Sequence, residues 1–400
     1  MPSRGLQLLY FMLTIARGML GSRFRAGVRM MATLSQQQTA SALSPAPFPN
    51  PSPPRGADRV LDIRQHRFSV APMMDYTDCH QRKLQRMISS ESVLYTEMVV
   101  ANALVRTDKQ WRFLEADFSI EEPLVLQLGG SDPKQMYDAA KIAHGYGYRQ
   151  MNINVGCPSE KVAGAGCFGA ALMLNPQLVA ELAMSIYVAT GVPASVKCRI
   201  GVDDHDSYEE LQEFVRIVSE RGKVSHFIIH ARKAVLGAKF TPDDNRKIPK
   251  LKYDFVYSLV KDFPHLYFSI NGGVLTMEDC AVHLSMGCIG VMVGRQVINN
   301  PFYWRSVDND LYSKQDSSSR MNRKQILERY CSYASDTEMK QGEKVRRALI
   351  KPLFQLFNAE TNGKQFRILM DKYVSDSKIG IGDAIHKSSQ CLTEETLTAL

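Results

Sequence analysis

The sequence lacks several patterns that would have assigned it to a common class of protein. Its 400 residues contain eight cysteines but no C-x-x-C pair, which argues against a structural zinc site or a thioredoxin-like dithiol. The apolar run from Leu8 to Ala16 is too short to span a bilayer. We therefore expect free thiols in a reducing compartment, no metal site and no membrane segment.

The first 57 residues also lack acidic side chains, because Asp58 is the first in the chain. Arginines between Arg4 and Arg29 are spaced among apolar residues and serines, as in an import presequence. The proline-rich stretch SALSPAPFPNPSPPRGAD follows and cannot build a core. We predict that residues 1–57 are a presequence and linker that direct the protein to mitochondria. The alternative is a disordered extension of a cytoplasmic protein.

Residues 58–305 alternate short apolar runs with amphipathic stretches. Continuous apolar strands separated by helical patterns are typical of parallel strands that are buried on both faces. About eight such units in roughly 240 residues predict an α/β fold of the (β/α)8 TIM-barrel type rather than an open sheet. The expected strands are FSVAPM, VLYTEMV, LVLQLGG, MNINVGCP, ASVKCRIG, FIIHARK, YFSINGG and GVMVGR.

Residues 306–400 have helical periodicity and no strand signal. The stretches RKQILERYCSYASD, KVRRALIKPLFQLF and KQFRILMDKYVSD carry this pattern. We predict a small helical domain here, with a polar tail after Ile381. The formal net charge of +8 is compatible with a polyanionic partner.

Glycine-rich strand ends predict a phosphate site at one end of the barrel. The loops after strands seven and eight of such barrels commonly bind phosphate through backbone N–H groups. In SINGG and VMVGRQ, Gly272, Gly273 and Gly294 would supply these groups, and Arg295 would add a charged fork. Two tight turns without a ligand are the alternative.

Polar side chains end three further strands. Lys197 lies within the strand pattern SVKCRIG, where an ammonium needs an anionic partner. His230 and Gln127 are placed similarly, and the three together resemble the contacts to the polar edge of a bound flavin. Taken singly, each is an ordinary polar residue at the end of a strand.

The stretch NVGCPSEKVAGAGCFGAAL contains two cysteines, Cys157 and Cys167. Its GAGCFG portion matches G-x-G-x-x-G but does not follow the strand directly, and no acidic residue lies about 20 residues later. We therefore interpret this portion as a loop over the barrel mouth rather than a dinucleotide site. A redox pair and a single working thiol both remain open on this evidence.

Eight motifs, in order, closely resemble those of tRNA-dihydrouridine synthases, in particular the bacterial-type (20/20a) subfamily. The resemblance runs from about Arg67 to Tyr303 and more loosely into the helical region. The motifs are SVAPMMDYTD, LYTEMV, LQLGGSDP, NINVGCPS, KCRIGVDDHDSY, FIIHARKA, SINGG and VGRQ.

The resemblance implies an FMN enzyme that uses NADPH to reduce a uridine of the tRNA D-loop, at position 20 or 20a, to 5,6-dihydrouridine. Hydride would pass from reduced FMN to C6 of the base, and Cys157 would give a proton to C5. Thiols suit this task because their ordinary pKa of about 8.5 keeps them protonated at neutral pH. By the same resemblance, the residues that contact FMN are Pro72, Met73, Met74, Gln127, Lys197, His230, Asn271, Gly272, Gly273, Gly294 and Arg295.

The tRNA partner would be held by polar and basic residues from both parts of the chain. The resemblance assigns Asn154 to a tRNA contact. Basic stretches add further candidates for phosphate contacts. The candidates are Lys233 and Arg246 after the sixth strand, with Lys247 beside them, and Arg346, Arg347, Lys364 and Arg367 in the helical domain.

The sequence departs from the family where a second cysteine is common, since GAAL with Ala171 replaces GACL. An FMN barrel enzyme that acts on a small molecule is the first alternative, and a catalytically silent tRNA-binding protein is the second. The oligomeric state stays open.

Overall fold

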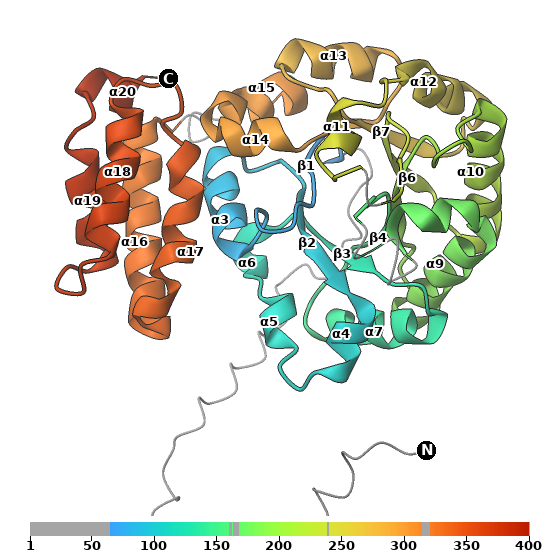
Figure 1. Cartoon of the computed structure of the whole chain (residues 1–400), viewed down its shortest axis with the longest axis horizontal. Helices are drawn as coiled ribbons and strands as arrows, with labels where there is room; N and C mark the ends of the chain where they lie inside the picture. Colours follow the sequence, from blue (N-terminus) through green and yellow to red (C-terminus); the bar gives the residue numbers. More distant parts are fainter. Residues whose placement is uncertain (1–64, 160–161, 163–167, 238–239, 314–320, 400) are drawn as a thin grey trace, which may run out of the picture. The chain divides into compact units, whose positions relative to one another are not determined.

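The computed structural model describes residues 65–159, 162, 168–237, 240–313 and 321–399. Eight parallel strands form one sheet in the order β1-β8-β7-β6-β5-β4-β3-β2 (Figure 1). Strand β1 and the residue before β2 close the ring, because Val70 N–H donates to the Val93 carbonyl at 2.9 Å and Val93 N–H donates to the Phe68 carbonyl at 3.0 Å. The predicted TIM barrel is confirmed.

Each of the eight predicted strands is present. All but β2 are shorter than the predicted runs, and β2 is shifted by one residue from its run. The strands are β1 Phe68–Val70, β2 Leu94–Val100, β3 Leu124–Gly129, β4 Met151–Val155, β5 Ser195–Arg199, β6 His226–His230, β7 Tyr267–Asn271 and β8 Gly290–Val293.

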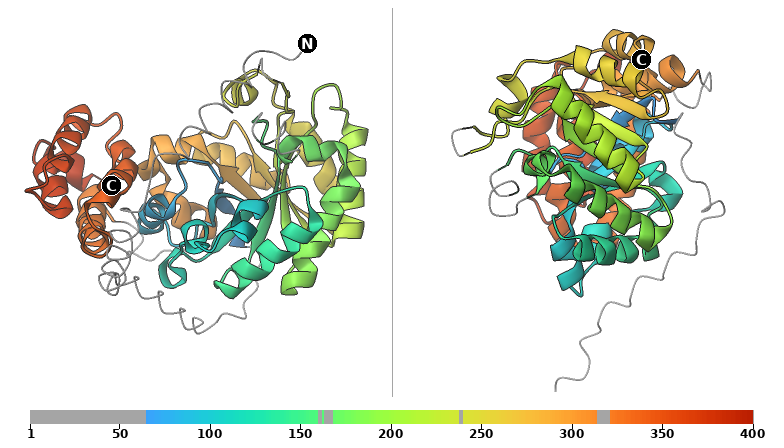
Figure 2. Two further views of the ribbon diagram at one scale, coloured as in Figure 1. Left: turned by 60° about the horizontal axis from the view of Figure 1, so that its bottom comes forward. Right: turned by 90° about the vertical axis from the view of Figure 1, so that its right-hand side faces the viewer.

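Helices surround the strands in every view (Figures 1 and 2). Helices α7 and α9 each have proline in the first turn and a side-chain cap, from Asp132 and Asn175. The helical segments of this part are α3 Cys79–Ile88, α4 Ala101–Arg106, α5 Trp111–Leu114, α6 Phe118–Glu121, α7 Pro133–Gly145, η2 Gly169–Leu174, α9 Pro176–Thr190, α10 Tyr208–Gly222, α11 Asp244–Lys247, α12 Tyr253–Asp262, α13 Met277–Ser285, α14 Arg295–Asn299, η3 Pro301–Ser306 and α15 Val307–Tyr312.

Side chains fill the inside of the barrel, as close packing requires. The central apolar cluster comes from several strands and from the residues that adjoin them: Ala71, Val93, Tyr95, Val125, Ile228 and Met292. The outer faces of the strands pack on the helices in a larger core. A solid interior leaves the mouth, at the carboxyl ends of the strands, as the place for a ligand.

A second core lies among the helices after residue 321. These are α16 Arg323–Gln341, η5 Glu343–Val345, α17 Arg346–Ile350, η6 Lys351–Gln355, α18 Gly363–Val374, α19 Ile381–Ser389 and α20 Glu394–Thr398. The prediction of a polar tail after Ile381 was wrong, because Ile381, Ala384 and Ile385 are buried in this core. Their spacing of three and four residues places them on one face of α19.

The boundary at residue 306 also needs correction. Helix α15 packs into the barrel core through Val307 and Leu311. The second core, in turn, includes Leu84 and Ile88 of α3 and also Phe302. Helix α3 lies between β1 and β2 in the chain but contributes its apolar side chains to the second core, so the two cores do not follow the residue ranges of the predicted domains.

Residues 1–57 lie outside the described residues, and so does most of the GAGCFG stretch, including Cys167. In the part of the chain that the structure describes, no helix is both long enough and apolar enough to cross a membrane.

Candidate active site

The turn that carries Cys157 is fixed at the carboxyl end of β4. The Asn154 side-chain oxygen accepts hydrogen bonds from the N–H groups of Gly156 and Cys157, at 3.1 and 3.0 Å. The Cys157 carbonyl accepts from Ala170 N–H at 2.9 Å. Gly169 has a φ of +68°, and a Cβ there would lie 2.6 Å from this carbonyl, so glycine is required. The half-buried free thiol of Cys157 thus stands on a rigid turn.

A chain of hydrogen-bonded side-chain amides fixes the strand residues beside this turn. Asn154 Nδ2 donates to Gln127 Oε1, and Gln127 Nε2 donates to Asn152 Oδ1, both at 2.8 Å. Asn152 Nδ2 donates to Ser195 Oγ at 2.9 Å. These bonds use one of the two N–H groups on the Gln127 amide, so the other can serve a ligand. Asn154 was expected to touch tRNA, and here it also supports the turn of Cys157.

Lys197 lies beside Asn154 in the β4–β5 register. Its Nζ donates to Asn271 Oδ1 at 3.1 Å, and Asn271 Nδ2 donates to the Met292 carbonyl at 2.7 Å. Burial, aided by the neighbouring charge of Arg199, lowers the pKa of Lys197 to about 8. The ammonium therefore has an amide as its hydrogen-bond partner in the described structure rather than a carboxylate.

Arg199 is a site residue that the sequence analysis did not assign. It is buried, and its Nε donates to the Gly156 carbonyl at 2.9 Å. Its Nη1 donates to the carbonyls of Lys233 and Asn245, at 2.9 and 3.1 Å. It thus ties the Cys157 turn to the segment after β6. Its position two residues after Lys197 was the available signal, since alternate residues of a strand share one face.

His230 packs against the glycines that follow β7. Gly272 has a φ of +103°, and a Cβ there would lie 2.3 Å from the His230 ring. Gly273 has a φ of +77°, and its Cβ would lie 2.5 Å from the Tyr253 hydroxyl. Burial, with the charges of Arg199 and Lys197, keeps the pKa of His230 well below its usual range. His230 is therefore neutral at pH 7 and can offer one N–H to a ligand.

Positive charge is concentrated around these residues. Among the described residues, the Nε atoms of Arg232 and Arg246 are buried without a hydrogen-bond partner. Arg295, the first residue of α14 after β8, is half-exposed, and its guanidinium is 3.9 Å from the Asp243 carboxylate. An anionic group such as a phosphate fits this site. It would meet the arginine donors that have no partner, the desolvated ammonium of Lys197 and the close backbone of the glycines after β7.

The other predicted flavin contacts lie on the loop after β1. Pro72 and Met73 are partly buried, and Met74 is exposed. A Cβ on Gly294 would lie 3.4 Å from the Met73 sulfur, so the β1 and β8 ends adjoin. The structure therefore brings the predicted flavin residues to one mouth. Their contacts with a cofactor stay predictions.

The predicted tRNA contacts fall into two groups. Lys233 donates to the Asp203 carbonyl at 2.7 Å, and Arg246 pairs with Asp243 at 3.4 Å, both near the mouth. Lys364 and Arg367 lie apart from these on α18. Arg346, one of the candidate phosphate contacts of the sequence analysis, is buried in an ion pair with Glu338.

A TIM barrel with a cationic, glycine-lined mouth and a thiol at a strand end has the features of an enzyme that binds an anionic cofactor. The model of the dihydrouridine synthase family matches residues 69–393. The chain belongs to this family, which confirms the resemblance in its motifs.

Bacterial relatives named tRNA-dihydrouridine(20/20a) synthase are similar over most of the chain. The one from Synechocystis sp. is 42% identical over 312 residues, which are 78% of this chain and 89% of the relative. The one from Vibrio vulnificus is 39% identical over 328 residues, covering 82% and 96%. Among solved structures, an old yellow enzyme homologue from Zymomonas mobilis covers 61% of this chain and 89% of its own, with 13% identity and a TM-score of 0.45. That similarity is too low to bear on function.

Proposed function

We propose how this chain performs the reaction of its family, the flavin-dependent reduction of uridine in tRNA to 5,6-dihydrouridine. We place the target uridine at position 20 or 20a of the D-loop, in line with the names of the relatives. The small-molecule alternative has no support among these relatives, whose names specify tRNA.

The flavin in this proposal is FMN. Its phosphate would meet the backbone of Gly272 and Gly273 and the guanidinium of Arg295. Lys197 and His230 would donate to the polar edge of the ring system, where a cation stabilises negative charge. When bound and reduced by NADPH, the flavin supplies an electron pair and a hydrogen to C6 of the uracil.

Cys157 completes the reduction by giving its thiol proton to C5. The rigid turn of Cys157 supports this assignment. Asn154 accepts hydrogen bonds from two N–H groups of the turn, and Arg199 donates to the Gly156 carbonyl. A donor that is fixed at the mouth can protonate one face of a base without rearrangement. The lowered pKa of Lys197 is compatible with a second role, holding negative charge that develops on the ring system.

The tRNA must present an unstacked uridine, because a base within the D-loop stack cannot reach the mouth. Asn154, Lys233 and Arg246 would contact the RNA there, and Lys364 and Arg367 would contact its backbone at a distance. We also propose that residues 1–57 direct the protein to mitochondria, on the arginine-rich composition alone.

The Cys157→Ala variant tests the central assignment. It should retain FMN and still oxidise NADPH, because the thiol takes no part in reducing the flavin. Formation of dihydrouridine in an unmodified tRNA transcript should fall about 10²–10⁴-fold, the usual contribution of a positioned acid. Dihydrouridine can be counted by mass spectrometry of digested RNA.

Two controls separate a proton donor from other roles of cysteine. Cys331→Ala removes another partly buried free thiol, on α16, and should leave the rate within a few-fold of wild type. Cys167→Ala should do the same. Equal losses from Cys157→Ala and Cys167→Ala, or a disulfide between the two during turnover, would instead establish a redox pair.

A further inference from the structure

Three aromatic side chains are exposed on two neighbouring segments, the loop after β1 and the connection between β2 and β3. Tyr76, on the loop between β1 and α3, is 49% exposed. Trp111 and Phe113, on α5 after β2, are 46% and 40% exposed. We call these three residues the aromatic rim. Exposed aromatic side chains grouped in this way commonly mark a binding surface.

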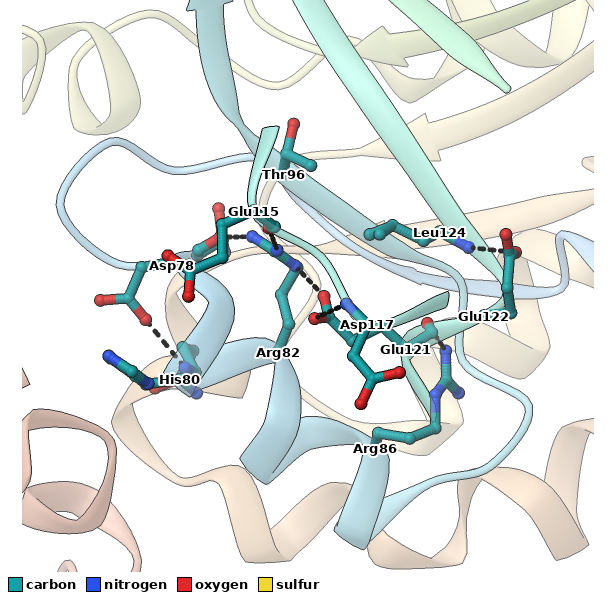
Figure 3. Close-up of polar contacts among 12 residues, drawn as sticks. Asp78, His80, Arg82, Arg86, Thr96, Glu115, Asp117, Glu121, Glu122 and Leu124 are labelled. Atoms are coloured by element: carbon teal, nitrogen blue, oxygen red, sulfur yellow. Dashed lines mark hydrogen bonds and ion pairs between the residues drawn. The ribbon is translucent and has the colours of Figure 1, made fainter. Parts of the chain in front are cut away.

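Arg82 of α3 fastens the two loops of the rim to each other (Figure 3). Its Nη1 donates to the Thr77 carbonyl at 3.0 Å, and its Nη2 donates to the Glu115 carbonyl at 2.8 Å. Its Nε pairs with the Glu121 carboxylate at 2.5 Å, and both side chains are buried. Thr77 follows Tyr76, and Glu115 lies two residues after Phe113. The rings are therefore carried on a preformed base, which lowers the entropy lost on binding.

Two of the three rings also have a cation beside them. The Arg112 guanidinium lies 5.4 Å from the centre of the Trp111 ring. The Lys351 ammonium, from η6, lies 5.1 Å from the centre of the Tyr76 ring, and Lys351 also donates to the Asp75 carbonyl. Proteins that bind single-stranded nucleic acid combine aromatic rings, on which bases stack, with nearby cations, which attract the phosphates.

We propose that the aromatic rim binds the tRNA substrate by stacking on unpaired bases next to the extruded uridine. The inference rests on the proposed function, which brings a uridine of tRNA to this mouth. Extrusion of a base takes a stacking partner from its neighbours, and a fixed aromatic ring can replace that partner. The rim thus names a further part of the tRNA-binding surface, beyond Asn154 and the basic candidates.

Tryptophan fluorescence gives a direct test, because the chain has two tryptophans and Trp304 is buried. Stacking of a base on Trp111 quenches its emission. Titration of the FMN-loaded enzyme with an unmodified tRNA transcript should therefore quench wild type, and Trp111→Phe should lose the effect. Equal quenching in both proteins, or no quenching while binding is seen by fluorescence polarisation, would overturn the proposal.

Affinity provides the second measurement. Tyr76→Ala and Trp111→Ala should each raise the Kd for tRNA about fivefold to a hundredfold, while the dependence of Kd on salt stays as in wild type. Tyr76→Phe keeps the ring and should stay within about twofold. The matched control is Tyr267→Ala, since Tyr267 is 38% exposed at the first residue of β7, at the opposite end of the barrel. An equal effect of this control would also overturn the proposal.

The outcomes distinguish this inference from the proposed function. If the rim variants bind tRNA like wild type while Cys157→Ala still abolishes uridine reduction, the rim proposal is wrong and the reaction stands. If wild type forms no dihydrouridine in tRNA, the proposed function itself fails. Unchanged tRNA binding together with lost self-association of the rim variants would assign the surface to a protein partner instead.

Discussion

Replacing Lys197 by methionine tests whether the mouth carries a desolvated cation. Burial lowers the pKa of this lysine to about 8, from an ordinary value of 10.5. Below pH 8 the ammonium is present in both the folded and the unfolded chain, so its desolvation reduces stability in full. As the pH rises from 8 towards 10.5, the folded state releases its proton first and this cost disappears.

The expected size follows from the same two pKa values. Their difference of about 2.5 corresponds to about 3 kcal/mol at 1.36 kcal/mol for each pKa unit. Solvent screening of the partly exposed side chain makes the true desolvation cost smaller than this value. Loss of the hydrogen bond to Asn271 costs the variant about 1 kcal/mol. The flavin-free Lys197→Met variant should therefore be more stable than wild type at pH 7 by about 1–2 kcal/mol.

Urea unfolding of the flavin-free chains between pH 7 and pH 10 measures this difference. The advantage of the variant should shrink steadily above pH 8. Lys261→Met, at an exposed lysine of α12, should change stability little at any pH. A Lys197→Met variant that is less stable at pH 7, by an amount that does not change with pH, would refute the reasoning. With FMN the order should reverse, because the variant lacks the flavin contact that we propose for Lys197.

Two further predictions concern the phosphate site and the first residues of the chain. Arg295→Ala should raise the Kd for FMN about tenfold, since it removes the charge-assisted contact that we propose with the phosphate. Flavin that stays bound should react at a rate within a few-fold of wild type. An unchanged Kd, measured by quenching of FMN fluorescence, would remove Arg295 from the site. Residues 1–57 fused to a fluorescent reporter should bring it into mitochondria, and a diffuse cytosolic signal would show that the arginine spacing is not an import signal.

The barrel could be predicted from the sequence because its signal is local and repeated. Each strand is an apolar run that ends in polar or glycine residues, and a parallel barrel places all eight ends at one mouth. Gly272 and Gly273 were identifiable for the same reason, since a glycine pair directly after a strand indicates a close backbone approach.

The contacts that depend on distant segments could not be predicted. Arg199 looked like an ordinary strand-end arginine until the segment after β6 and the turn of Cys157 supplied its three carbonyl partners. Arg346 looked like a surface charge because its partner, Glu338, lies on another helix. The rim was missed because exposure of Tyr76 and Trp111 depends on which neighbours fold over them.

Helix α3 has a consequence for how this enzyme can be divided or recombined. It carries Leu84 and Ile88 into the core of the C-terminal helices while its first turn holds the loops of the mouth. A cut at residue 306 would expose that apolar face, so loss of tRNA binding by such a fragment would not distinguish recognition from misfolding. A chimera that borrows the C-terminal helices of a relative needs the matching α3 as well, because the unit of exchange is discontinuous along the chain.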